Sequence, residues 1–178
     1  MPPVMENSKL SLLLIFILPL STMAQNQEIA EAKLIFSLPE KWRLAQNAGT
    51  LDDGLVQYFY YREPIKTEDG LDAHPATIFI LEKTKGRELS ALVSGDINRE
   101  KSGRLSKGKF GAVEDLKVDG RESKRIVVET EDSGFKLRTW FYYFINNDVF
   151  VKLILNTIRE PNPAEEEQQS IVNSIKLD

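Results

Sequence analysis

The feature that most constrains the fold is a series of tight turns in the second half of the chain. Asp119-Gly120, Asp132-Ser133-Gly134 and Asn146-Asn147-Asp148 are typical of the short connections between antiparallel strands. They separate β-prone segments at residues 112–118, 123–130, 135–145 and 149–158. This alternation of strand and turn predicts an antiparallel meander.

The third of these segments indicates that the sheet is covered on both faces. Side chains alternate between the two faces of a strand. One face would carry Leu137, Phe141, Tyr143 and Ile145, and the other Trp140, Tyr142 and Phe144. Both sets are apolar or aromatic, so we expect helices or other elements to pack on each side of the sheet.

Two stretches predict the helices that would provide this cover. In residues 88–101, Leu89, Leu92, Val93 and Ile97 fall at helical spacing. The last helix would open at Asn162-Pro163-Ala164-Glu165, with an N-cap residue, a proline at the first helical position and an acid at the third. Its apolar face would comprise Ala164, Gln168, Ile171, Val172 and Ile175. The fold class is therefore α+β, an antiparallel meander with helices packed on it.

The first half of the domain supplies further strands. Residues 34–36 predict a short strand stopped by Pro39, after which Trp42 would fold back as a core anchor. Residues 55–61 and 76–81 are also β-prone. The polar stretch 25–33 is expected to fray.

The N-terminus is typical of an export signal. Lys9 precedes an apolar run from Leu10 to Leu20, and small residues lead to a cleavage position after Ala24. The run is too short to span a bilayer and contains Pro19. We therefore predict a signal peptide at 1–24, a single domain at 25–178, no transmembrane span after cleavage, and a periplasmic or secreted location. With no cysteine in the chain, stability must come from the core.

Several of these segments together resemble the PsbP-like α/β/α sandwich family. The resemblance rests on the start Phe36-Ser37-Leu38-Pro39-Glu40-Lys41-Trp42, on the long meander, and on the ending Ser170-Ile171-Val172-Asn173-Ser174-Ile175-Lys176. The family includes extrinsic photosystem subunits, a nuclear-import GTPase-binding protein and many exported bacterial proteins. The resemblance implies a binding or assembly protein without catalysis, and it transfers no functional residue to this chain.

The residues themselves offer little for catalysis. Cysteine nucleophiles are excluded, and His74, the single histidine, stands beside a proline in a polar loop. A zinc site of several histidines and cysteines is excluded by composition. The string from Gly103 to Lys109 is similar to a phosphate-binding loop, but Phe110 stands where Ser or Thr would hold magnesium. We predict no catalytic, metal-binding or cofactor-binding residue and no cofactor; a hydrolase that uses carboxylates is the least favoured alternative.

A basic stretch is the first candidate binding site. Lys101, Arg104, Lys107 and Lys109 concentrate positive charge in a protein whose net charge is −4. That net charge argues against a nucleic-acid partner. We therefore expect an anionic partner, either an envelope protein or an anionic surface such as lipid head groups. The sequence leaves the oligomeric state open.

An aromatic cluster is the second candidate. Trp140, Tyr142 and Phe144 would either fill the core of the sheet or line an apolar pocket. These two sites lead to two functions. The first is an exported, non-enzymatic binding or assembly-support protein of the cell envelope, and the alternative is a carrier of a small apolar ligand.

Overall fold

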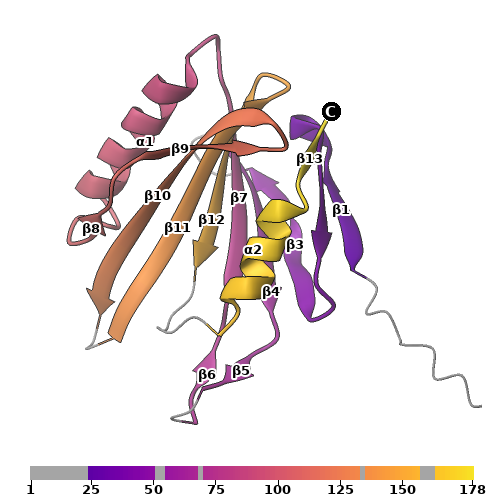
Figure 1. Cartoon of the computed structure of the whole chain (residues 1–178), viewed down its shortest axis with the longest axis vertical. Coiled ribbons are helices and arrows are strands. Elements are labelled where there is room, and N and C mark those ends of the chain that lie inside the picture. The colour runs from indigo at the N-terminus through magenta and orange to yellow at the C-terminus, as the bar shows by residue number, and fades with distance from the viewer. Residues whose placement is uncertain (1–23, 51–54, 68–69, 133–134, 157–162) are drawn as a thin grey trace, which may run out of the picture.

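The computed structural model describes residues 24–50, 55–67, 70–132, 135–156 and 163–178 (Figure 1). The predicted signal peptide therefore lies outside the described residues except for Ala24. Among the described residues, no helix has the length and hydrophobicity needed to cross a membrane.

The centre of the molecule is an antiparallel sheet of eight described strands in the order β3-β4-β7-β12-β11-β10-β8, with β9 also pairing with β10. The strands are β3 (Trp42–Thr50), β4 (Val56–Arg62), β7 (Ala76–Lys83), β8 (Lys109–Phe110), β9 (Glu114–Val118), β10 (Arg121–Asp132), β11 (Phe135–Asn146) and β12 (Val149–Asn156). The sequential pairing of β9, β10, β11 and β12 confirms the predicted meander.

A second, three-stranded sheet packs on the central one. Its strands are β1 (Gln25–Ile29), β2 (Leu34–Leu38) and β13 (Lys176–Leu177). The expectation that residues 25–33 fray is wrong, because β1 pairs with β2 along its whole length and a 3-10 turn, η1 (Ala30–Ala32), joins them. Ile29 and Ala32 bury their side chains there. A further two-stranded ribbon, β5 (Ile65–Lys66) and β6 (Asp72–Ala73), extends from the connection between β4 and β7.

The two described α-helices lie on opposite faces of the central sheet. Helix α1 (Leu89–Ser102) has the predicted bounds to within a residue, and Leu89, Leu92 and Val93 are buried. Helix α2 (Glu165–Asn173) begins later than expected, with Ala164 rather than Asn162 at the N-cap. Asn162 lies outside the described residues. The predicted apolar face of α2 is confirmed, since Gln168, Ile171 and Val172 are buried and so is Ile175 just after the helix.

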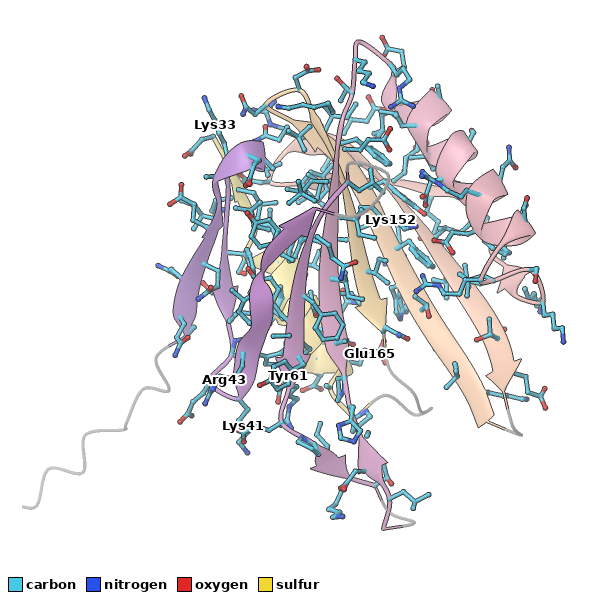
Figure 2. The ribbon with its side chains drawn as sticks, turned by 180° about the vertical axis from the view of Figure 1, so that it is seen from behind. Lys33, Lys41, Arg43, Tyr61, Lys152 and Glu165 are labelled. Atoms are coloured by element: carbon cyan, nitrogen blue, oxygen red, sulfur yellow. The ribbon has the colours of Figure 1, made fainter. Side chains whose placement is uncertain are left out.

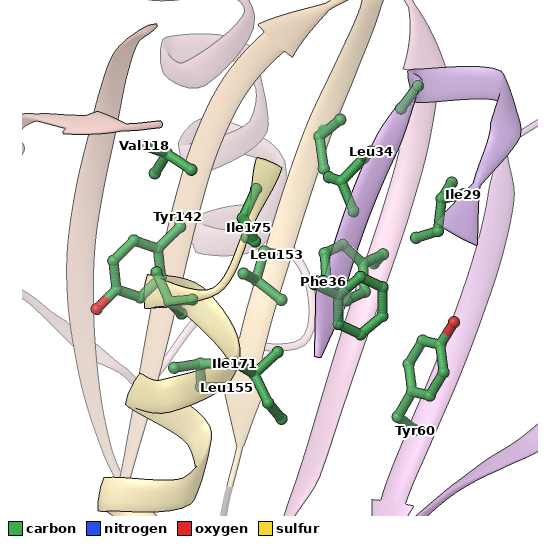
Figure 3. Close-up of a cluster of buried hydrophobic side chains, with 14 of the residues drawn as sticks. Ile29, Leu34, Phe36, Tyr60, Val118, Tyr142, Leu153, Leu155, Ile171 and Ile175 are labelled. Atoms are coloured by element: carbon green, nitrogen blue, oxygen red, sulfur yellow. The ribbon is translucent and has the colours of Figure 1, made fainter. Parts of the chain in front are cut away.

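Two hydrophobic clusters correspond to the two faces, and Figure 3 shows part of the larger one. The larger one joins α2 and the small sheet to the central strands and contains Phe36, Tyr60, Phe79, Leu153 and Ile171. In it the ring centroids of Phe36 and Phe79 are 4.8 Å apart. Trp42 is fully buried in the same cluster, which confirms the prediction that it anchors the domain.

The other cluster lies beneath α1. It includes Phe141 and Tyr143 of β11, whereas Tyr142 and Phe144 belong to the larger cluster. The prediction that β11 is apolar on both sides and covered on both sides is therefore confirmed. The arrangement is an α+β fold in which one layer is α1, the middle layer is the sheet, and the third is α2 with β1, β2 and β13 (Figure 1).

Candidate binding groove

The predicted basic stretch lies where α1 ends and the chain turns into β8, and the structure divides its four cations into two pairs. The ammonium of Lys101 lies 5.2 Å from the centre of the Phe110 ring, and the guanidinium of Arg104 lies 3.7 Å from the Glu100 carboxylate. Both cations thus have a partner within the domain. The remaining two, Lys107 and Lys109, line a surface groove.

This groove has a volume of about 470 Å³ and lies at the ends of β8, β10 and β11. Its lining consists of Lys107, Lys109, Glu129, Thr130, Glu131, Lys136, Leu137 and Arg138. The sequence analysis missed the contribution of β11. Lys136 and Arg138 alternate with apolar residues in the sequence, but only the pairing of β11 with β10 brings them opposite Glu131 and Glu129.

A close approach of the backbone at Gly108 positions the two lysines of the turn. A Cβ at this position would lie 2.8 Å from Cγ1 of Val128 and 3.0 Å from the carbonyl oxygen of Leu105. Only glycine therefore fits against β10 here. The chain turns sharply, with the Gly108 N–H donating to the Leu105 carbonyl, and presents Lys107 and Lys109 on either side of the turn.

The groove carries more positive than negative charge. Its lining contains four cations and two carboxylates. One of the carboxylates, that of Glu129, lies 3.5 Å from the guanidinium of Arg138. Within the described part of the chain, Lys107, Lys109 and Lys136 have no carboxylate at ion-pair distance. Many other cations are paired, for example Arg62 with Glu167, Lys124 with Asp115, Arg125 with Glu114 and Lys176 with Asp119. Three unpaired ammonium groups thus share one groove.

The aromatic cluster of Trp140, Tyr142 and Phe144 belongs to the core on the α2 side of the sheet. Tyr142 and Phe144 are buried in the larger core cluster, and the Tyr142 hydroxyl donates to Gln169 at 3.0 Å. Trp140 is partly buried against the same core, with the guanidinium of Arg125 5.0 Å from its ring centre. These side chains pack in the core between the sheet and α2.

A buried charge cluster under α1 was not predicted. Lys152 of β12 is buried and its ammonium lies 2.7 Å from Asp96 and 2.6 Å from Glu100 (Figure 2). The Tyr143 hydroxyl donates to Asp96 at 3.0 Å, and both burial and this carboxylate raise the pKa of Tyr143. A small cavity of about 130 Å³ adjoins the cluster. The available signal was a lone lysine within the otherwise apolar strand β12.

The Lys152 cluster is better suited to holding α1 on the sheet than to chemistry. The ammonium is satisfied by two carboxylates and lies 5.0 Å from the centre of the Phe141 ring. An amino group engaged by two carboxylates is poorly placed to attack a substrate as a nucleophile. Among the described residues, no group of three or more histidine, cysteine, aspartate or glutamate side chains could hold a metal ion.

Comparison with known proteins gives a fold but no sequence family. No family model and no curated protein matches the sequence. The cyanobacterial PsbP of Synechocystis sp. PCC 6803 has a TM-score of 0.61 at 9% identity, covering 99% of this chain and 100% of that chain. The Ran-binding protein Mog1p of Saccharomyces cerevisiae has a TM-score of 0.56 at 16% identity, over 88% of this chain and 96% of that one.

A third similar structure is LpqN, involved in cell envelope biogenesis of Mycobacterium tuberculosis. Its TM-score is 0.53 at 8% identity, over 87% of this chain and 90% of that chain. The chain spans about half, 48%, of the length of a similar structure from Bacteroides thetaiotaomicron. At such low identities the likeness shows the fold alone, which is the PsbP-like α/β/α sandwich that the sequence resembles.

Proposed function

From the PsbP-like fold of this chain, we propose that it is an exported, non-enzymatic binding or assembly-support protein of the cell envelope that engages an anionic partner through the groove. The observation that carries this proposal is the set of three unpaired lysines, Lys107, Lys109 and Lys136, on one open groove of a protein with net charge −4. Unpaired cations gathered against the global charge attract and orient an acidic surface.

The envelope location is supported by two independent points. Lys9, the apolar run from Leu10 to Leu20 and the small residues up to Ala24 follow the order of an export signal. The name of one fold neighbour, LpqN, refers to cell envelope biogenesis. A binding role also suits a chain whose groove contains lysines and carboxylates but no described histidine.

The partner that we propose is an acidic protein of the envelope rather than a lipid surface. The groove interleaves Glu129 and Glu131 with its cations, so its charge is patterned and not uniformly positive. A patterned surface distinguishes partners by the placement of their charges, whereas adsorption to lipid head groups needs only an excess of positive charge.

Affinity capture from envelope extracts tests this function. A variant with Lys107→Glu, Lys109→Glu and Lys136→Glu should lose the captured protein, whereas the wild type retains it at low salt. The matched control carries Lys33→Glu, Lys83→Glu and Lys85→Glu, which are exposed and produce the same change of net charge. None of these control residues lines the groove, and Lys33 is labelled at the upper left of Figure 2.

The control variant should capture the partner as the wild type does. Equal capture by all three proteins would exclude the groove as the docking surface. Binding to anionic vesicles without any captured protein would show that lipid head groups are the partner and would contradict the proposal of an acidic protein.

A further inference from the structure

The last residues of β10 form an open edge of the central sheet beside the groove. Along this side of β10, β9 pairs with Arg121–Arg125 and β8 pairs with Val128 and Glu129. From Thr130 onward no described strand pairs with this edge. Figure 1 shows the end of β10 projecting past β8.

The main chain of Glu131 faces this open edge. Neighbouring residues of an antiparallel strand direct their hydrogen-bonding groups alternately to the two sides. The Gly111 N–H donates to the Val127 carbonyl at 2.9 Å, so Val127, Glu129 and Glu131 form the outward-directed set. The N–H and C=O of Glu131 are therefore placed to pair with an added strand.

The turn before β8 closes one end of this edge. Lys109 lies opposite Glu129 in the pairing of β8 with β10, so the preceding residue, Gly108, lies opposite Thr130. Because Gly108 has no side chain, it does not clash with Cγ2 of Thr130. Because β10 ends at Asp132, an added chain pairs with β10 only at Glu131 and then meets Gly108. Its last residue would lie opposite Glu131, with Lys107 and Lys109 around its end.

We propose that the groove takes the free C-terminal residue of a partner polypeptide, which pairs with Glu131 in the antiparallel direction at the end of β10. This inference rests on the proposed function and specifies its partner. In the antiparallel direction the C-terminus of the added strand abuts the turn, so the Glu131 N–H donates to the terminal carboxylate. The ammonium groups of Lys107 and Lys109 balance its charge.

The alternatives fit the groove less well. A parallel strand would bring an N-terminal ammonium against two lysines, which costs electrostatic energy. An internal segment would have to continue through Gly108. On the other side of Glu131, Lys136 lies directly opposite in β11 and adds to the positive charge of the groove that receives the carboxylate.

The test uses two acetylated hexapeptides of alternating threonine and valine, one with a free C-terminal carboxylate and one amidated. Binding to ¹⁵N-labelled protein is followed by amide chemical shifts. The carboxylate peptide should produce saturable shifts at the amides of Glu131 and Lys109, and amidation should weaken binding by about tenfold or more. Equal binding of the two peptides, shifts confined to other elements, or no saturable shift up to about 10 mM of either peptide would overturn the proposal.

Two variants separate this inference from the proposed function. Glu131→Pro removes an N–H that is directed away from β11, so the sheet should remain folded while the carboxylate peptide is lost. Lys107→Ala with Lys109→Ala should remove the preference for the carboxylate over the amide. If the charge-reversal variant loses its envelope partner but amidation has no effect, the groove docks an acidic surface and the C-terminal inference alone is wrong.

Discussion

At the scale of single residues, Lys152 shows how a buried charge is used as an attachment point. Its ammonium joins the central strand β12 to Asp96 and Glu100 of α1 at hydrogen-bond distance. Asp96 also accepts from Tyr143, and Arg99 lies 3.3 Å from its carboxylate. Buried pairs of this kind add little net stability over an apolar core, but removing one partner leaves the other uncompensated.

Lys152→Met should therefore destabilise the protein by about 3–5 kcal/mol, because Asp96 and Glu100 would lose the buried cation that they share and keep only the more exposed Arg99 and Arg104. Urea unfolding monitored by tryptophan fluorescence measures this loss. The control adds Asp96→Asn and Glu100→Gln to Lys152→Met and should recover at least about half of the stability. A loss below about 1 kcal/mol for the single variant would mean that the cluster does not hold α1.

At the scale of elements, α2 is fastened to the edge of the sheet by one carboxylate. Oε2 of Glu167 accepts hydrogen bonds from Nε1 of Trp42 and Nε of Arg62, both at 2.7 Å, and Oε1 accepts a third from Arg62 at 3.0 Å. Burial would raise the pKa of Glu167, but the hydrogen bonds from Arg62 and Trp42 outweigh it, and the pKa is lowered. The ionised carboxylate is thus the form that holds the helix.

This gives α2 a predictable pH dependence. A lowered pKa contributes stability that is present above the ordinary pKa of glutamate and is lost as the pH falls through the lower folded-state pKa. The wild type should therefore lose stability below about pH 4.5, and Glu167→Gln should lose less over the same range. Urea midpoints between about pH 6 and pH 3 measure the difference. Parallel curves for the two proteins would contradict the role of this carboxylate.

The elements themselves follow closely from local patterns, whereas the contacts between them do not. Turn residues such as Asp119-Gly120 fix where strands end, and the spacing of Leu89, Leu92 and Val93 fixes α1. The prediction for residues 25–33 was wrong because a polar, half-exposed strand lacks a strong pattern and depends on its pairing with β2. In the same way, Lys152 stands out as a lone charge in β12, but no local pattern gives its partners or those of Glu167.

At the scale of the whole molecule, the candidate site is a product of topology. The sequence analysis found Lys107 and Lys109 because they are neighbours along the chain. It placed Lys101 and Arg104 in the same patch, although one stacks on Phe110 and the other pairs with Glu100. Lys136 joins the groove only through the pairing of β11 with β10, a contact that composition and spacing do not specify.

The end of β10 is a strand edge of the central sheet that lies beside the proposed docking groove. Because both faces of the central sheet are covered, only the main-chain groups at its strand edges can pair with another polypeptide. The end of β10 is such an edge, and it lies beside Lys107, Lys109 and Lys136. The two elements that cover the faces, α1 and α2, serve as support in this view. The functional surface is then a sheet edge and not a pocket between the layers.

The salt dependence of binding to the captured envelope partner tests the central claim most directly. The dissociation constant is measured by titration calorimetry between about 20 mM and 500 mM salt. We predict that it rises steeply with salt for the wild type and for the control with Lys33→Glu, Lys83→Glu and Lys85→Glu. The variant with Lys107→Glu, Lys109→Glu and Lys136→Glu should bind at least about a hundredfold more weakly at low salt. Equal affinity and equal salt dependence of all three proteins would contradict the claim that this groove docks an anionic partner.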